Sequence, residues 1–115
     1  MRIIARRTLN EFVESLTGQK DRRAVEAALS AWYHEVKQAQ WETSADVKRR
    51  YAKASIISAD RVVFDIKGGS YRLVVAVDYE KAIVWIKWIG PHAAYDKIDV
   101  KRVQYHDQRS KARPH

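Results

Sequence analysis

The sequence predicts an α+β fold in which two N-terminal helices pack on one face of a small, mainly antiparallel β-sheet. Apolar residues recur every three to four positions in the first third of the chain, which indicates amphipathic helices. Later, short runs of β-branched and aromatic residues alternate with polar ones and are separated by glycine or aspartate turns, which indicates strands. With 115 residues we expect one folded domain over residues 1–100 and a basic C-terminal tail over residues 101–115.

The N-terminal elements are marked by local signals. The short apolar run over residues 1–4 predicts a strand added to the sheet. Thr8 and Glu11 have the spacing of a capping box, so a helix is expected to start there and to end at Gly18. A second amphipathic helix is expected to open near Asp21.

The segment WETSADVKRRY, residues 41–51, interrupts the helical pattern. Thr43 or Ser44 is expected to cap a short helical turn that begins at Ala45. Basic residues beside Tyr51 suit single-stranded RNA, because cations hold phosphates while an aromatic ring stacks on a base. The alternative, a solvated loop with one buried tyrosine, is the more common arrangement for such a segment. The candidate RNA-binding cations here are Lys48, Arg49 and Arg50.

Three strands are expected over residues 61–67, 71–79 and 82–89. Side chains alternate between the two faces of a strand, and the more apolar face of each strand is expected to pack on the helices. In the last strand this places Trp88 on the helix side together with Val84 and Ile86. The residues left on the open face then form a basic, aromatic surface that consists of Lys67, Arg72, Trp85 and Lys87.

The amino-acid composition favours some binding partners and some cellular locations over others. The chain has 22 Lys and Arg against 14 Asp and Glu, a formal net charge of +8, which favours a polyanionic partner such as RNA. Cysteine is absent, which excludes disulfides, a thiol nucleophile and Cys-containing zinc sites. No secretory signal or membrane-length apolar run is visible, so we expect a soluble, cytoplasmic protein. No cofactor motif is present.

Titratable residues gather directly after the last strand, where Gly90-Pro91 ends it. A helical turn would place His92 beside Tyr95 and Asp96, and Lys97 follows. RNA cleavage through the 2′-hydroxyl needs a base, cations for the phosphate and an acid for the leaving oxygen, and the nucleophile belongs to the substrate. A histidine can supply either proton transfer, and Tyr95 or Asp96 can take the complementary role.

Several assignments remain open on the residues alone. Arg72 and Lys67 suit the phosphate, and Tyr95 or Trp85 suits stacking on a base. Structural alternatives are a hydrogen-bonded surface histidine, an Asp96 paired with Lys97 or Arg72, and a tyrosine that fills the core. A metal site from His92 and Asp96 lacks a third ligand.

Two motifs in order, FDIKGGSYRLVV and IGPHAAYDKID, resemble the HigB family of bacterial type II toxins in the RelE/ParE-like superfamily. The resemblance extends to about residue 100 and implies a RelE-like fold. It also implies a metal-independent mRNA endonuclease (mRNA interferase) that acts on the ribosome and inhibits translation. The partner that it implies is a helix-turn-helix antitoxin of the HigA type, which allows a hetero-oligomer.

By the same resemblance, the residues with catalytic roles are Arg72, His92, Tyr95 and Asp96, while Lys67 and Lys97 belong to the RNA-binding set. Pro91 departs from the family, which commonly has threonine or a similar donor before the histidine. Two other functions remain as alternatives: a non-catalytic RNA-binding or antitoxin-binding module, and a gyrase inhibitor like those of the ParE branch.

Overall fold

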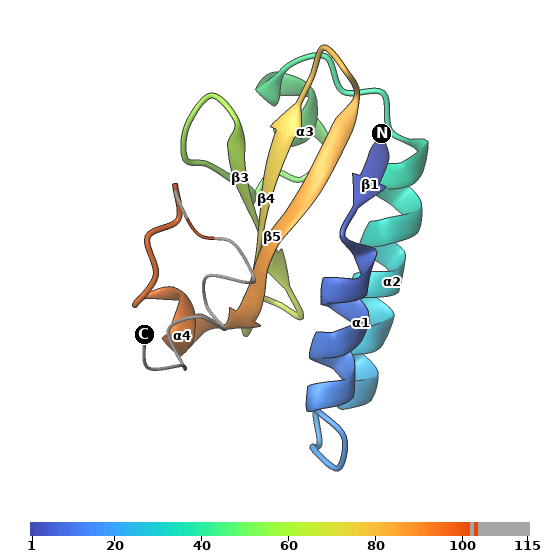
Figure 1. Cartoon of the computed structure of the whole chain (residues 1–115), viewed down its shortest axis with the longest axis vertical. Helices are drawn as coiled ribbons and strands as arrows, with labels where there is room; N and C mark the ends of the chain where they lie inside the picture. Colours follow the sequence, from blue (N-terminus) through green and yellow to red (C-terminus); the bar gives the residue numbers. More distant parts are fainter. Residues whose placement is uncertain (102, 104–115) are drawn as a thin grey trace, which may run out of the picture.

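The computed structural model describes residues 1–101 and 103 (Figure 1). One short strand and three helices come first, four strands follow, and a short helix comes last. In chain order they are β1 (Arg2–Ile4), α1 (Arg6–Ser15), α2 (Arg22–Gln38), α3 (Ser44–Arg50), β2 (Ser55–Ile56), β3 (Arg61–Ile66), β4 (Tyr71–Asp78), β5 (Ile83–Pro91) and α4 (His92–Tyr95). The predicted tail lies outside the described residues except for Lys101 and Val103.

The five strands form one sheet in the order β1-β5-β4-β3-β2. The pairs β2–β3, β3–β4 and β4–β5 are antiparallel, whereas β1 pairs in parallel with β5. The predicted N-terminal strand is therefore present. The sheet is mixed, which corrects the expectation of a mainly antiparallel one, because the N-terminal strand is joined to the rest by a helical crossover and not by a hairpin.

The first helix begins earlier than predicted. Ala5 adopts a left-handed conformation with φ 74° and α1 starts at Arg6, so Thr8 lies inside the first turn and is buried. The predicted capping box at Thr8 is therefore wrong. Gly18, with φ 83°, lies in the turn after α1, and Asp21 is the N-cap of α2 as expected.

The predicted cap of the third helix is confirmed at Thr43. Its side chain and that of Asp46 form a reciprocal capping box at the start of α3. The Asp46 carboxylate accepts the backbone N–H of Glu42 at 2.8 Å and that of Thr43 at 3.2 Å, and these bonds lower its pKa. Within the described residues no helix has the length and apolarity needed to cross a membrane.

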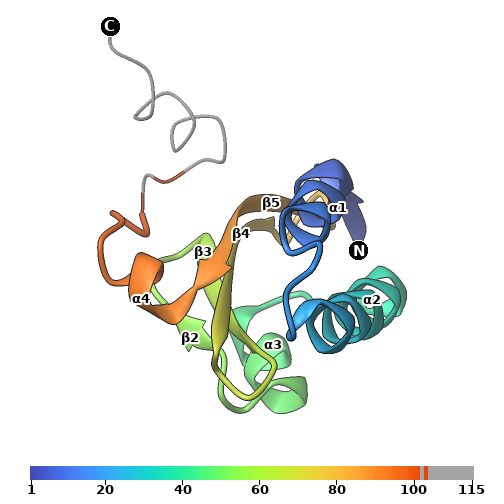
Figure 2. The ribbon, with the colours of Figure 1, turned by 90° about the horizontal axis from the view of Figure 1, so that it is seen from below.

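The larger apolar cluster lies between the sheet and α1, α2 and α3. Figure 2 shows α1 and α2 on one side of the sheet and α4 on the other. Buried residues of the helices and of the strands belong to the same cluster, and Trp32, Trp41 and Tyr51 surround the Phe64 ring. The strand residues of the cluster include Val62, Phe64, Ile66, Tyr71, Leu73, Val75, Val77, Val84, Ile86 and Ile89.

A β-bulge in β5 creates a second apolar cluster on the opposite face. Ile86 pairs with Val75 and Trp88 pairs with Val74, which leaves Lys87 as the extra residue between them. Beyond the bulge the alternation is reversed, so Trp88 faces away from α1 and α2. The prediction that it packs on the helix side is wrong. The second cluster consists of Val63, Val74, Trp88 and Val103, with Ile57, Ala94, Tyr95, Ile98 and Val100 packed against it.

Gly90 makes room for the Trp88 ring. A Cβ atom on Gly90 would lie 2.5 Å from Cη2 of Trp88 and 2.6 Å from Cζ2. We expect Gly90→Ala to lower the free energy of unfolding by about 1–3 kcal/mol through overpacking. Urea denaturation of both proteins measures this loss.

A Trp88→Leu background provides the control, because it removes the colliding ring. In that background the same alanine substitution should cost less. An equal cost in both backgrounds would show that the ring is not what requires glycine at this position.

Candidate functional site

Arg72 lies on the face of the sheet that is turned away from α1 and α2. It belongs to a cross-strand row with Asp65 and Gly90. Its Nη1 atom is 3.1 Å from Oδ1 of Asp65 and donates a hydrogen bond of 2.5 Å to the carbonyl oxygen of Gly69. The side chain is only 20% exposed. The guanidinium is therefore held in one place while part of it stays open to a ligand.

α4 directly follows β5 because of local backbone chemistry. Pro91, the N-cap of α4, ends β5 without needing a backbone donor, and the His92 N–H bonds to the Ser70 carbonyl at 3.0 Å. The next turn carries Tyr95 back over the sheet. This confirms the expected helical turn and ties it to the hairpin between β3 and β4.

Tyr95 joins the apolar cluster to Arg72. Its ring centroid is 6.3 Å from that of Trp88 and 5.9 Å from the Cζ atom of Arg72, within reach of a cation–π interaction. Burial raises the pKa of Tyr95; Arg72 opposes this, and the carboxylates of Asp96 and Asp65 add to it. The phenol therefore keeps its proton at neutral pH and can donate a hydrogen bond.

His92 and Asp96 are the solvent-exposed residues of the candidate site. Nε2 of His92 lies 3.8 Å from Oδ2 of Asp96, and the two side chains are 53% and 63% exposed. Such a loose, solvated pair contributes little to stability and leaves both groups accessible to a ligand. Lys97 follows on the same turn and is exposed.

Lys67 does not share the face of Arg72, which corrects the expectation. The residue adopts a left-handed conformation with φ 53° after β3, and its Nζ atom lies 3.5 Å from Oδ1 of Asp21 at the start of α2. The hydroxyl of Tyr71 donates to the other oxygen of the same carboxylate at 3.1 Å. Lys67 therefore points toward the helices.

Trp85 and Lys87 are also separated from Arg72. Trp85 is paired with Ala76, in the cross-strand row that starts at Arg61, and the apolar row of Trp88 lies between it and Arg72. Lys87 is the bulge residue, so its predicted place on a regularly alternating face does not apply. The expected continuous basic surface is thus replaced by a smaller site around Arg72.

The three cations of α3 have partners within the protein. Lys48 donates to the carbonyl oxygens of Ala52 and Ala54 at 2.6 and 2.8 Å, where it supports the chain after the helix. Arg49 pairs with Asp46 at 2.9 Å, and Arg50 bonds to Glu35. Tyr51 packs on Phe64 in the larger cluster. The segment is a helix and not the solvated loop of the alternative, Tyr51 is partly buried, and the segment does not meet Arg72.

Asp65 is the contact that sequence reasoning missed. The signal was present, because an aspartate in one strand and an arginine in the next are opposite charges that attract when they pair across a sheet. Finding it required the register Asp65↔Arg72, which depends on the length of the turn between the strands.

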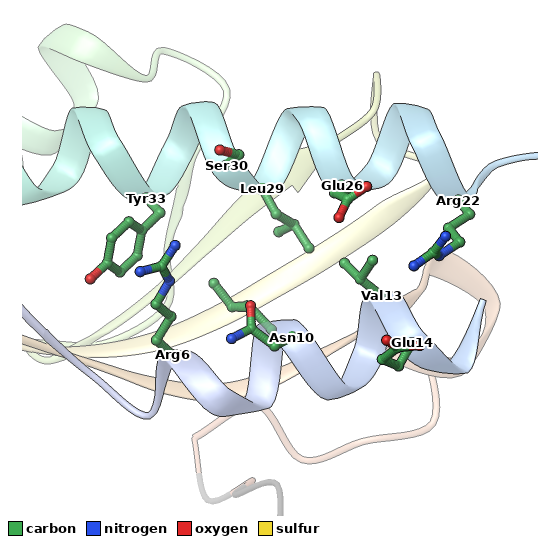
Figure 3. Close-up of a pocket in the computed structure, with 10 residues that line it drawn as sticks. Arg6, Asn10, Val13, Glu14, Arg22, Glu26, Leu29, Ser30 and Tyr33 are labelled. Carbon is green, nitrogen blue, oxygen red and sulfur yellow. The ribbon is translucent and has the colours of Figure 1, made fainter. Parts of the chain in front are cut away.

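A cleft of about 330 Å³ lies between α1 and α2, on the other side of the sheet (Figure 3). Arg6 and Tyr33 meet at one end, with the guanidinium carbon 4.1 Å from the ring centroid, and Arg22 lies at the other end. None of the predicted site residues lines it. We therefore place the candidate site at Arg72 and Tyr95.

Within residues 1–101 and 103, no group of three or more histidine, cysteine, aspartate or glutamate side chains is placed to hold a metal ion. In the described part of the chain, the His92–Asp96 pair has no third ligand of this kind beside it.

Taken together, fold and site define a small basic α+β protein with an anchored arginine, a half-buried phenol and an open imidazole–carboxylate pair on one sheet face. The model of the HigB toxin family, described as a RelE-like toxic component of a toxin-antitoxin system, matches residues 25–98. This is more than half of the chain and includes every member of the site. The chain therefore belongs to the HigB toxin family, and an antitoxin is implied as its partner. No curated protein matches the chain.

The electrostatic coupling of Tyr95 can be tested without any substrate. Arg72→Gln should raise the pKa of Tyr95 further, because it removes a charge that favours the phenolate. Asp96→Asn should lower it, because it removes a charge that opposes the phenolate. Titration of ¹³C-labelled tyrosine by NMR measures both shifts, and Tyr95→Phe assigns the resonance. Shifts in the same direction for the two variants would contradict this arrangement.

Proposed function

We propose that this toxin is a ribosome-dependent mRNA endonuclease whose active site contains Arg72, Tyr95, His92 and Asp96. The observation that carries the proposal is the convergence of an anchored cation, a protonated phenol and an open proton-transfer pair on one face of the sheet. Membership in a RelE-like toxin family favours RNase activity over the binding-only and gyrase-directed alternatives.

The chemistry follows from these groups. The RNA 2′-hydroxyl attacks the adjacent phosphorus as its proton passes to the imidazole–carboxylate pair of His92 and Asp96. Arg72 stabilises the negative charge that develops on the phosphoryl oxygens. The P–O5′ bond breaks, and the Tyr95 hydroxyl supplies a proton to the leaving 5′-oxygen. The products are a 2′,3′-cyclic phosphate and a 5′-hydroxyl end.

Two further features of the proposal concern partners. The excess of positive charge, +8 over the chain, suits docking against the phosphates of ribosomal RNA and mRNA. The antitoxin is proposed to be a helix-turn-helix protein of the HigA type. The interferase step itself requires no metal, because substrate hydroxyl and protein side chains supply all proton transfers.

Arg72→Gln should reduce RNA cleavage by about 10²–10³-fold, because it removes the group that stabilises the phosphoryl charge. Primer extension on a defined mRNA in a purified translation reaction, with and without ribosomes, measures this loss. With the wild-type protein, discrete 5′ ends are expected only when ribosomes are present.

Arg7→Gln is the matched control, since Arg7 lies on α1 in an exposed pair with Glu11 and its loss should leave cleavage unchanged. Circular dichroism should show that both variants fold. Intact transcripts with the folded wild-type protein would reject the endonuclease and favour a binding-only role, and DNA damage after expression would favour gyrase inhibition.

A further inference from the structure

Arg61 is a buried charged residue that the proposed chemistry does not use. It is 8% exposed and lies at the start of β3, on the same face as Arg72. Its Nη1 atom donates to the carbonyl oxygen of Val103 at 2.9 Å and to that of Val100 at 3.4 Å. Its Nε atom has no hydrogen-bond partner in the described part of the chain. A buried guanidinium that bonds to main-chain carbonyls holds a segment of chain in place.

The segment held by Arg61 follows α4 without a break. The Ile98 N–H bonds to the Tyr95 carbonyl at 3.2 Å, and the Val103 N–H bonds to the Asp99 carbonyl at 2.8 Å. Ile98, Val100 and Val103 all pack in the second cluster. We call residues 98–103, apart from the undescribed residue 102, the strap.

The cross-strand rows of the sheet show how far Arg61 lies from Arg72. On this face Arg61 belongs to one row, Val63, Val74 and Trp88 to the next, and Arg72 to the third. Rows two residues apart along a strand are separated by about 7 Å. The strap and Tyr95 cover the middle apolar row, and the two arginines lie on either side of it.

We propose that Arg61 is a positioning residue, which holds Tyr95 over Trp88 and beside Arg72 by fixing the far end of the strap. Without the two bonds to Val100 and Val103, these carbonyls would lie beside a buried apolar row without a donor, and the strap would separate from it. α4 is only four residues long, so the position of Tyr95 depends on tertiary contacts on both sides, the bond of the His92 N–H to Ser70 and the strap. The role in catalysis rests on the proposed endonuclease, whereas the placement of Tyr95 does not.

The test compares Arg61→Lys and Arg61→Met. Lysine keeps the charge but has one nitrogen on a shorter side chain, and methionine keeps apolar volume without a donor. In both variants the pKa of Tyr95 should fall toward its ordinary value, more in Arg61→Met, because the ring becomes less buried. The amide of Val103 should exchange faster with solvent. For cleavage, kcat should fall about 10–100-fold with a smaller change in KM, because Arg72 still binds the phosphate.

Val25→Ala is the control for a loss of stability alone, because Val25 is fully buried on α2 in the other cluster. It should lower the unfolding midpoint and leave the Tyr95 titration unchanged. A Tyr95 pKa that is the same in wild type, Arg61→Lys and Arg61→Met would overturn the positioning role. If the wild-type protein cleaves no RNA, the proposed function fails, but the titration and amide exchange still decide whether Arg61 places Tyr95.

Discussion

The β-bulge at Lys87 is the constraint on which both the second core and the candidate site depend. Without it, Trp88 would continue the alternation of Val84 and Ile86 and would compete for space with the helices. The extra residue turns the largest side chain of β5 to the opposite face, where it stacks with Val63 and Val74 in one cross-strand row. Gly90 is required as a consequence, because the indole occupies the space of its missing side chain.

The apolar row of Val63, Val74 and Trp88 explains the electrostatic properties of the neighbouring row, which contains Arg72 and Asp65. Arg72 lies beside the row of Trp88 and within 5.9 Å of the Tyr95 ring centroid, so its attraction to Asp65 is less screened by water than that of a surface pair. Burial beside the same row raises the pKa of Tyr95. A hydrophobic support thus lies beside the cation and raises the pKa of the tyrosine, while His92 and Asp96 remain outside it and accessible.

Local patterns in the sequence were sufficient for much of this fold. The alternation of apolar and polar residues predicted the two faces of β3 and β4. The spacing of His92 and Asp96 predicted the helical turn of α4. The capping signal was correct at Thr43 and wrong at Thr8, because the left-handed Ala5 starts α1 before Thr8 is reached. The bulge and the pairing of Asp65 with Arg72 depend on strand register. The direction of the Lys67 side chain depends on a positive φ angle. None of these has a signature in a single strand.

The family similarity and the physical site do not end at the same residue. The family match stops at residue 98, whereas the apolar row is covered as far as Val103 and the far end of that cover is fixed by Arg61. The residues within the family match thus supply the reactive groups, but only part of the side chains that pack over Trp88. Because a four-residue helix has no independent stability, the position of its last residue must come from tertiary contacts on either side. One side is the hairpin bond at His92, and the other is the strap.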